Sequence, residues 1–148
     1  MHHSASRARL HRLLRALVPG LLLALPARAE WTTVLVTAKP DGTAPEWGGD
    51  YPVVSTDGRY VAFMSYADSL QPGPGNGMAQ FYRRDVETGT TIRVSVSNTG
   101  AMQNENPVNW FRPTISGDGN RIAWSTMATN LVTDYANWID VFMRDIPL

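Results

Sequence analysis

The sequence predicts an all-β fold built around a hairpin that occurs twice. Residues 55–63 read Ser-Thr-Asp-Gly-Arg-Tyr-Val-Ala-Phe, and residues 116–124 read Ser-Gly-Asp-Gly-Asn-Arg-Ile-Ala-Trp. In each copy an Asp-Gly pair leads into a strand of β-branched and aromatic residues, which is a strong local signal for a β-hairpin. The chain also has 12 glycines and 10 prolines. It shows no sustained helical periodicity, so short strands separated by turns are expected throughout.

The N-terminal residues 1–29 are predicted to be a cleaved secretory signal peptide rather than part of the fold. Four arginines between positions 7 and 15 precede or interrupt an apolar run over residues 13–25, and Ala27-Arg28-Ala29 supplies an A-x-A cleavage site. The alternative is a membrane anchor, but the run is interrupted by Arg15 and Pro19 and is shorter than the ~20 apolar residues that span a bilayer. We therefore expect a periplasmic or secreted protein with no membrane association after cleavage.

Removing the leader changes the charge and the available chemistry. Five of the 13 basic residues lie in residues 1–29 and all 13 acidic residues follow them, so the mature charge is 8 − 13 = −5. An acidic domain argues against nucleic acid as a partner. All three histidines also lie in the leader, and the chain has no cysteine. These counts exclude Ser-His-Asp and Cys-His catalysis, zinc sites built on His or Cys, and disulfides, and they predict a protein that is not an enzyme and has no cofactor.

The mature residues 30–148 divide into two units of about sixty residues, residues 31–88 and 89–148. When the two units are aligned, corresponding residues are 58 positions apart from the pair Thr33 and Thr91 onward. The separation becomes 61 from Pro52 and Pro113, and 60 from Gln80 and Asp140. Every change in this separation falls in a predicted loop. Each unit is expected to be a four-stranded antiparallel meander. The strands predicted for the first unit and the start of the second cover residues 32–37, 52–55, 59–65, 79–85 and 91–97.

These residues carry a resemblance to a known family. Pro-x-x-Ser-x-Asp-Gly-Arg-x-Val-Ala-Phe from Pro52, an aromatic strand closing on Arg84-Asp85, and then Thr88-Gly89 resemble the β-propeller repeats of the TolB-type family. The second copy departs from this pattern at Asn120-Arg121. The resemblance implies two propeller-like blades, and such propellers serve mostly as binding platforms in exported proteins or as accessory domains of peptidases.

Two blades leave the propeller incomplete, because a ring closes with roughly four to eight. If residues 91–97 complete the first sheet, the second sheet lacks a fourth strand and residues 32–37 lack partners. Copies could then join head to tail, with residues 32–37 of one chain completing the last blade of the next. Alternatively, the sequence is a piece of a longer repeat protein with open edges, which we favour because Ile146-Pro147-Leu148 stops where the first unit turns into its next strand.

Two sets of side chains with oxygen atoms suggest a functional interpretation. Asp134, Asn137 and Asp140 recur every three residues and offer oxygen ligands to calcium, although three side chains fall short of the six to eight ligands that calcium takes. A solvated turn is the alternative. Asp57-Gly58 and Asp118-Gly119 are interpreted as structural turn residues rather than a catalytic carboxylate pair.

The aromatic residues divide into strand and loop positions. Phe63 and Trp124 occupy matching strand positions and are expected in the core between blades. The loop aromatics could contact a peptide or sugar ligand, or equally cap the core, and the residues considered for binding are Trp47, Trp110, Phe111 and Trp138. The sequence thus predicts an exported, non-catalytic binding or scaffold module, whose partners are other proteins or copies of itself at open blade edges. The alternative is a truncated accessory fragment of an exported hydrolase or peptidase.

Overall fold

A computed structural model of the chain describes residues 31–108, 112–133 and 138–147. The predicted signal peptide and four of the proposed ligand residues, namely Trp110, Phe111, Asp134 and Asn137, lie outside the described residues. The contacts between residues divide the chain into two units, residues 1–32 and residues 33–148. The fold described below is that of the second unit. The described residues include no helix with the length and apolar character needed to cross a membrane.

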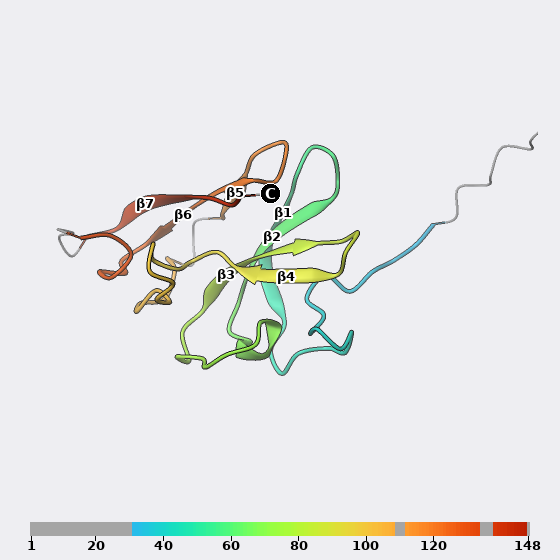
Figure 1. Ribbon diagram of the computed structural model, residues 1–148, viewed down its shortest axis with the longest axis horizontal. Coiled ribbons are helices and arrows are strands. Elements are labelled where there is room, and N and C mark those ends of the chain that lie inside the picture. The colour runs from blue at the N-terminus through green and yellow to red at the C-terminus, as the bar shows by residue number, and fades with distance from the viewer. Residues whose placement is uncertain (1–30, 109–111, 134–137, 148) are drawn as a thin grey trace, which may run out of the picture. The chain divides into compact units, whose positions relative to one another are not determined.

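The described residues form two antiparallel β-sheets (Figure 1). The first sheet has the order β1 (Gly49–Val54), β2 (Tyr60–Ser65), β3 (Gln80–Asp85) and β4 (Thr90–Arg93). The second has the order β5 (Thr114–Ile115), β6 (Arg121–Thr126) and β7 (Asp140–Asp145), and a single 3-10 turn, η1 (Asp68–Leu70), follows β2. The all-β prediction is confirmed. The expectation of four strands in each sheet is wrong for the second sheet, in which three are described.

The strand predicted at residues 32–37 is also not formed. These residues belong to no sheet, and residues 36 and 37 are already in a turn. The reason lies in strand pairing, because a β-strand needs a neighbour for its backbone N–H and C=O groups. The outer edge of β3 is occupied by β4, through pairs that include Arg83 with Ile92. High β-propensity at residues 32–37 therefore does not produce a strand on the first sheet.

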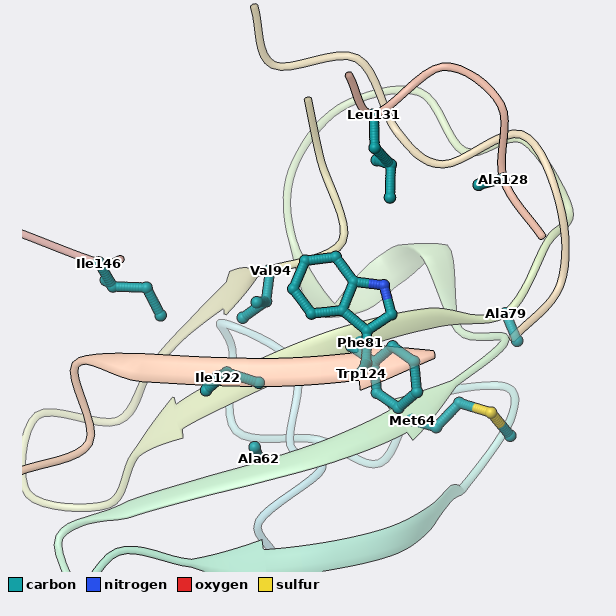
Figure 2. Close-up of a cluster of buried hydrophobic side chains, with 10 residues drawn as sticks. All are labelled: Ala62, Met64, Ala79, Phe81, Val94, Ile122, Trp124, Ala128, Leu131 and Ile146. Carbon is teal, nitrogen blue, oxygen red and sulfur yellow. The ribbon is translucent and has the colours of Figure 1, made fainter. Parts of the chain in front are cut away.

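The main core lies between the two sheets. From the first sheet, Ala62, Met64 and Phe81 point toward the second, where Trp124 lies 6.1 Å from Phe81 between ring centroids. Figure 2 shows these side chains converging with Val94 and others into one cluster. Their exposed fractions are at most 7%. Because burying a large apolar side chain stabilises a fold by about 1.5–3 kcal/mol, this layer holds the sheets together.

A smaller cluster covers the opposite face of the first sheet. Phe63 and Tyr82 stack there with ring centroids 5.7 Å apart, beneath Leu70 of η1. Val36 packs on the same cluster. Side chains alternate along a strand, so Phe63 and its neighbour Met64 lie on opposite faces of the sheet. The segment that contains Val36 therefore lies on the side of the first sheet that faces away from the second sheet.

That segment, residues 36–43, forms a compact loop that we call the first hook. The amide of Lys39 donates to the carbonyl of Thr43 (2.9 Å), and the amide of Gly42 donates to the carbonyl of Lys39 (2.9 Å). The Arg84 guanidinium fixes it to β3 by donating to the Ala38 carbonyl at 3.1 Å. Gly42 has φ +82°, a value that a residue with a side chain rarely adopts.

Residues 94–101, the second hook, repeat this structure on the second sheet. The amide of Ser97 donates to the carbonyl of Ala101 (2.7 Å), and Gly100 donates to Ser97 (3.0 Å) and has φ +86°. Arg144 of β7 donates to the Val96 carbonyl at 2.8 Å. Each of these backbone groups lies 58 residues after its counterpart in the first hook. The two sheets therefore carry the same hook, held by the same Arg-to-carbonyl contact.

The Phe81 ring gives a direct test of the inter-sheet core. We expect F81A to lower the free energy of unfolding by about 3–5 kcal/mol, because it removes a ring that is fully buried and contacts Trp124. Urea unfolding followed by circular dichroism measures this change. V54A, at a position with 57% exposure, is the control and should change stability by less than about 0.5 kcal/mol. Equal effects of the two substitutions would contradict the assignment of this core.

Candidate interaction surface

Among the strands that the structure describes, β7 has the least protected outer edge. β7 pairs with β6 over its whole length, from Arg121 opposite Asp145 to Thr126 opposite Asp140, and it is the last strand of the second sheet. Its side chains alternate. Phe142 lies 6.3 Å from Trp124 between ring centroids, whereas Val141 and Met143 are 72% and 61% exposed. β7 therefore presents apolar side chains at an edge.

β3, which occupies the same place in the first sheet, is covered on both faces and both edges. β2 pairs with one edge and β4 with the other. Phe81 and Tyr82 are fully buried, and Arg83 and Arg84 are half-buried. At an offset of 60, Phe81 and Arg83 correspond to Val141 and Met143. β7 is thus exposed because the neighbours that cover β3 have no counterpart among the described residues, and not because its residues are polar.

The other described edges carry features that block strand addition. β1 contains Pro52, an irregular register between Asp50 and Val53, and a positive φ of 54° at Tyr51. β4 has only four residues and exposes the polar Thr90, while β5 has two residues and follows Pro113. Proline, bulges and short length are the usual protections of edge strands. Six-residue β7, which has regular pairing and an apolar outer face, has none of these.

Further apolar side chains lie around β7 and the loops beside it. Met127 and Ile139 line a hollow of about 470 Å³ together with Tyr66 and residues 105–108. Their exposed fractions are 46% and 50%. Single exposed apolar residues are ordinary on protein surfaces. Residues 107–108 pair with β6 at Ser125 and Thr126, on the edge of β6 that does not pair with β7. This hollow is therefore a second apolar surface, separate from the outer edge of β7.

The proposed aromatic ligand residues divide between two places. Trp47 is 63% exposed and lines a hollow of about 390 Å³ with Glu46, Tyr66, Asp68 and Gly77. Trp138 is 78% exposed and stands two residues before β7. Tyr66 lines both this hollow and the one beside Ile139. Trp47 and Trp138 are thus accessible, as a binding role requires.

Of the proposed calcium ligands, the structure describes one. Asp140 begins β7 and is exposed. The described residues contain no group of three His, Cys, Asp or Glu side chains close enough to hold a metal ion. Asp140 alone offers too few oxygen atoms for calcium.

The two Asp-Gly turns have nearly the same geometry. Asp57 accepts hydrogen bonds from the Ser55 hydroxyl (2.5 Å) and the Arg59 amide (3.0 Å), and Gly58 has φ +75°. Asp118 accepts from the Ser116 hydroxyl (2.5 Å) and the Asn120 amide (3.1 Å), and Gly119 has φ +73°. These contacts lower the pKa of both carboxyl groups, chiefly through the serine hydroxyls. Both aspartates thus act on the backbone of their own turns.

The ends of β3 and β7 carry Arg–carboxylate pairs that differ in burial. Arg59 donates to one oxygen of Asp85 through Nε (3.1 Å) and Nη2 (2.7 Å), and the Asp85 side chain is 12% exposed. Arg121 reaches Asp145 through Nε at 2.7 Å, but both side chains are about two-thirds exposed. The Arg59 hydrogen bond is the main cause that lowers the pKa of Asp85 from 3.8 to about 2, with the amides of Thr88 and Glu87 adding to it. The first pair therefore contributes more to stability.

Comparison with known protein families, characterised proteins and solved structures finds no match to this chain. Its own geometry is therefore the basis for a functional conclusion. Sequence reasoning did not select Val141 and Met143. The signal available was the continuous apolar run Val141-Phe142-Met143, which places apolar side chains on both faces of one strand.

The two Arg–carboxylate pairs give a matched test. We expect D85N to lower the free energy of unfolding by about 1–2 kcal/mol at pH 7, because it removes a charge-assisted contact to a shielded carboxylate. D145N should have a clearly smaller effect than D85N, since its pair is exposed to solvent. Urea unfolding of the two variants and the wild type measures both effects.

The pH dependence of the D85N effect follows from the direction of the shift. The folded pKa of Asp85 lies below its unfolded value, so the stabilisation is present above about pH 4 and is lost as pH falls toward 2. The difference between wild type and D85N should shrink over that range. A difference that stays constant down to pH 2 would contradict the assigned role of the carboxylate.

Proposed function

We propose that this chain is an exported, non-catalytic binding module that takes an extended segment of a protein partner onto the edge of β7. The main support is that Val141 and Met143 of β7 are 72% and 61% exposed. The strands at the other described edges contain proline or a bulge, or are short. An edge of this kind provides backbone donors and acceptors for affinity, and alternate side chains provide specificity.

The resemblance of the repeated hairpins to TolB-type propeller blades supports the same proposal. Two sheets stacked through an apolar core, each with a meander order of strands, are compatible with neighbouring blades. Residues 30–148 contain no histidine or cysteine, which agrees with a role in binding rather than in nucleophilic catalysis. The predicted leader supports a location of that binding in the periplasm or outside the cell.

Peptide selection tests the proposal. A displayed library of random ten-residue peptides is selected on the immobilised full-length chain. We expect the selected peptides to be rich in β-branched residues and to lose at least tenfold in affinity for M143K, because Lys at an edge strand disfavours strand addition. V54K, which alters a comparably exposed valine on β1, is the matched control and should bind normally. Peptide affinities that are unchanged by M143K, or that fall equally for M143K and V54K, would overturn the proposal.

A further inference from the structure

Residues 90–101 connect the two sheets by contributing a strand to one and a hook to the other. β4 pairs with β3 in the first sheet, through Thr91 with Arg84 and Ile92 with Arg83. The second hook then packs on the second sheet, where Val94 joins the Trp124 cluster and Arg144 donates to the Val96 carbonyl. One continuous segment thus closes the edge of one sheet and covers the face of the next.

Residues 32–43 have the matching sequence, but only their hook is in place. Thr33, Val34 and Gly42 correspond to Thr91, Ile92 and Gly100 at the offset of 58. The first hook packs on the first sheet as the second hook packs on the second, while Val34 and Leu35 are in no strand and are 61% and 50% exposed. Residues 33–35 are therefore strand-forming residues that pair with neither of the two described sheets.

The β7 edge of the same chain does not supply that sheet. The first hook contacts Phe63 and Tyr82, on the face of the first sheet opposite to Met64 and Phe81. The second sheet packs against the Met64 and Phe81 face. The first sheet therefore stands between residues 33–35 and β7 of their own chain. Pairing between these two segments requires two copies.

Matching hollows lie beside β3 and β7, and they differ in whether a fourth strand lines them. In the first sheet, a hollow of about 390 Å³ is lined by Leu70 and Arg84 together with Thr90 and Thr91 of β4. In the second sheet, the corresponding Leu131 and Arg144 line a hollow of about 270 Å³ together with Met143. Thr32 and Thr33 match Thr90 and Thr91 at the offset of 58. The same two threonines of another copy would supply the wall that β4 supplies in the first sheet.

We infer that residues 32–35 of one copy add as a fourth strand to β7 of a second copy, as β4 adds to β3 within one chain. The inference rests on the proposed function, since it names a second copy of this chain as the partner of β7. The register follows from β3 and β4: Arg83 pairs with Ile92, so Met143 lies opposite Val34, and Arg144 lies opposite Thr33. Val34 and Met143 are each 61% exposed in the single chain. Their pairing buries two apolar side chains where the first sheet has Arg83 beside Ile92.

This contact joins different surfaces of the two copies, so each chain both donates and accepts a strand. Such a heterologous interface repeats and yields a closed ring or an extended chain of copies. The expected assembly is therefore larger than a dimer, unless the rotation that relates neighbouring copies closes the ring after two of them.

Cysteine cross-linking tests the register, because the chain contains no cysteine of its own. In the full-length chain, V34C/M143C should form disulfide-linked multimers on mild oxidation at micromolar concentration. The matched control is V34C/V54C, since Val54 is 57% exposed but lies on β1. We expect at least tenfold more linked product from the first pair. Equal yields would overturn the inference.

Light scattering provides a second readout that does not depend on cysteine. The unaltered full-length chain should have the mass of several copies, M143K should be monomeric with an unchanged circular dichroism spectrum, and V54K should assemble normally. A monomeric unaltered chain, or an assembled M143K, would overturn the inference. A third outcome separates the two proposals. If the chain is monomeric but the selected peptides bind the wild type and fail to bind M143K, self-association is overturned and the proposed binding function stands.

Discussion

β4 pairs with the first sheet, and the hook that follows it packs on the second. The rest of the structure depends on this shared segment. It completes the backbone hydrogen bonds of β3, and directly after its strand it places Val94 in the same cluster as Trp124. Because strand pairing and apolar packing are supplied by one stretch of chain, neither sheet completes its structure without the other. Among the described residues, no such segment pairs with the outer edge of β7.

The relative sizes of the stabilising effects follow from burial. Fully buried side chains such as Phe81 and Tyr82 each contribute a few kcal/mol, whereas the Arg121–Asp145 pair is exposed to solvent and contributes far less. Arg83 links the sheets in another way, by donating to the Gly119 carbonyl at 2.9 Å and lying over the Tyr60 ring at 4.4 Å. Apolar packing therefore sets the stability, and the polar contacts position the turns and hooks.

Local features were predictable from the sequence, and pairing between distant segments was not. The hairpin strands β2 and β6 follow from Asp-Gly turns with alternating apolar residues, and the turn geometry at Gly58 and Gly119 needs no distant contact. Residues 32–37 have equal strand propensity, but their state depends on whether an edge is available. The exposure of Met143 likewise depends on which segments lie against β7, and sequence pattern alone does not report this.

Two parts of the described chain lack a pairing partner, namely the outer edge of β7 and residues 33–35. Together they determine which kind of association between copies is favoured. Symmetric pairing of β7 with β7 of another copy would cover Val141 and Met143, but it would leave Val34 and Leu35 exposed in both copies. Addition of residues 32–35 to β7 covers both features and uses the register already present between β3 and β4. The hook also holds the donor strand in place through the contact from Arg84 to the Ala38 carbonyl, so little additional ordering is needed on binding. Head-to-tail strand addition is therefore favoured over a symmetric dimer, since it extends between chains the exchange that joins the two sheets within one chain.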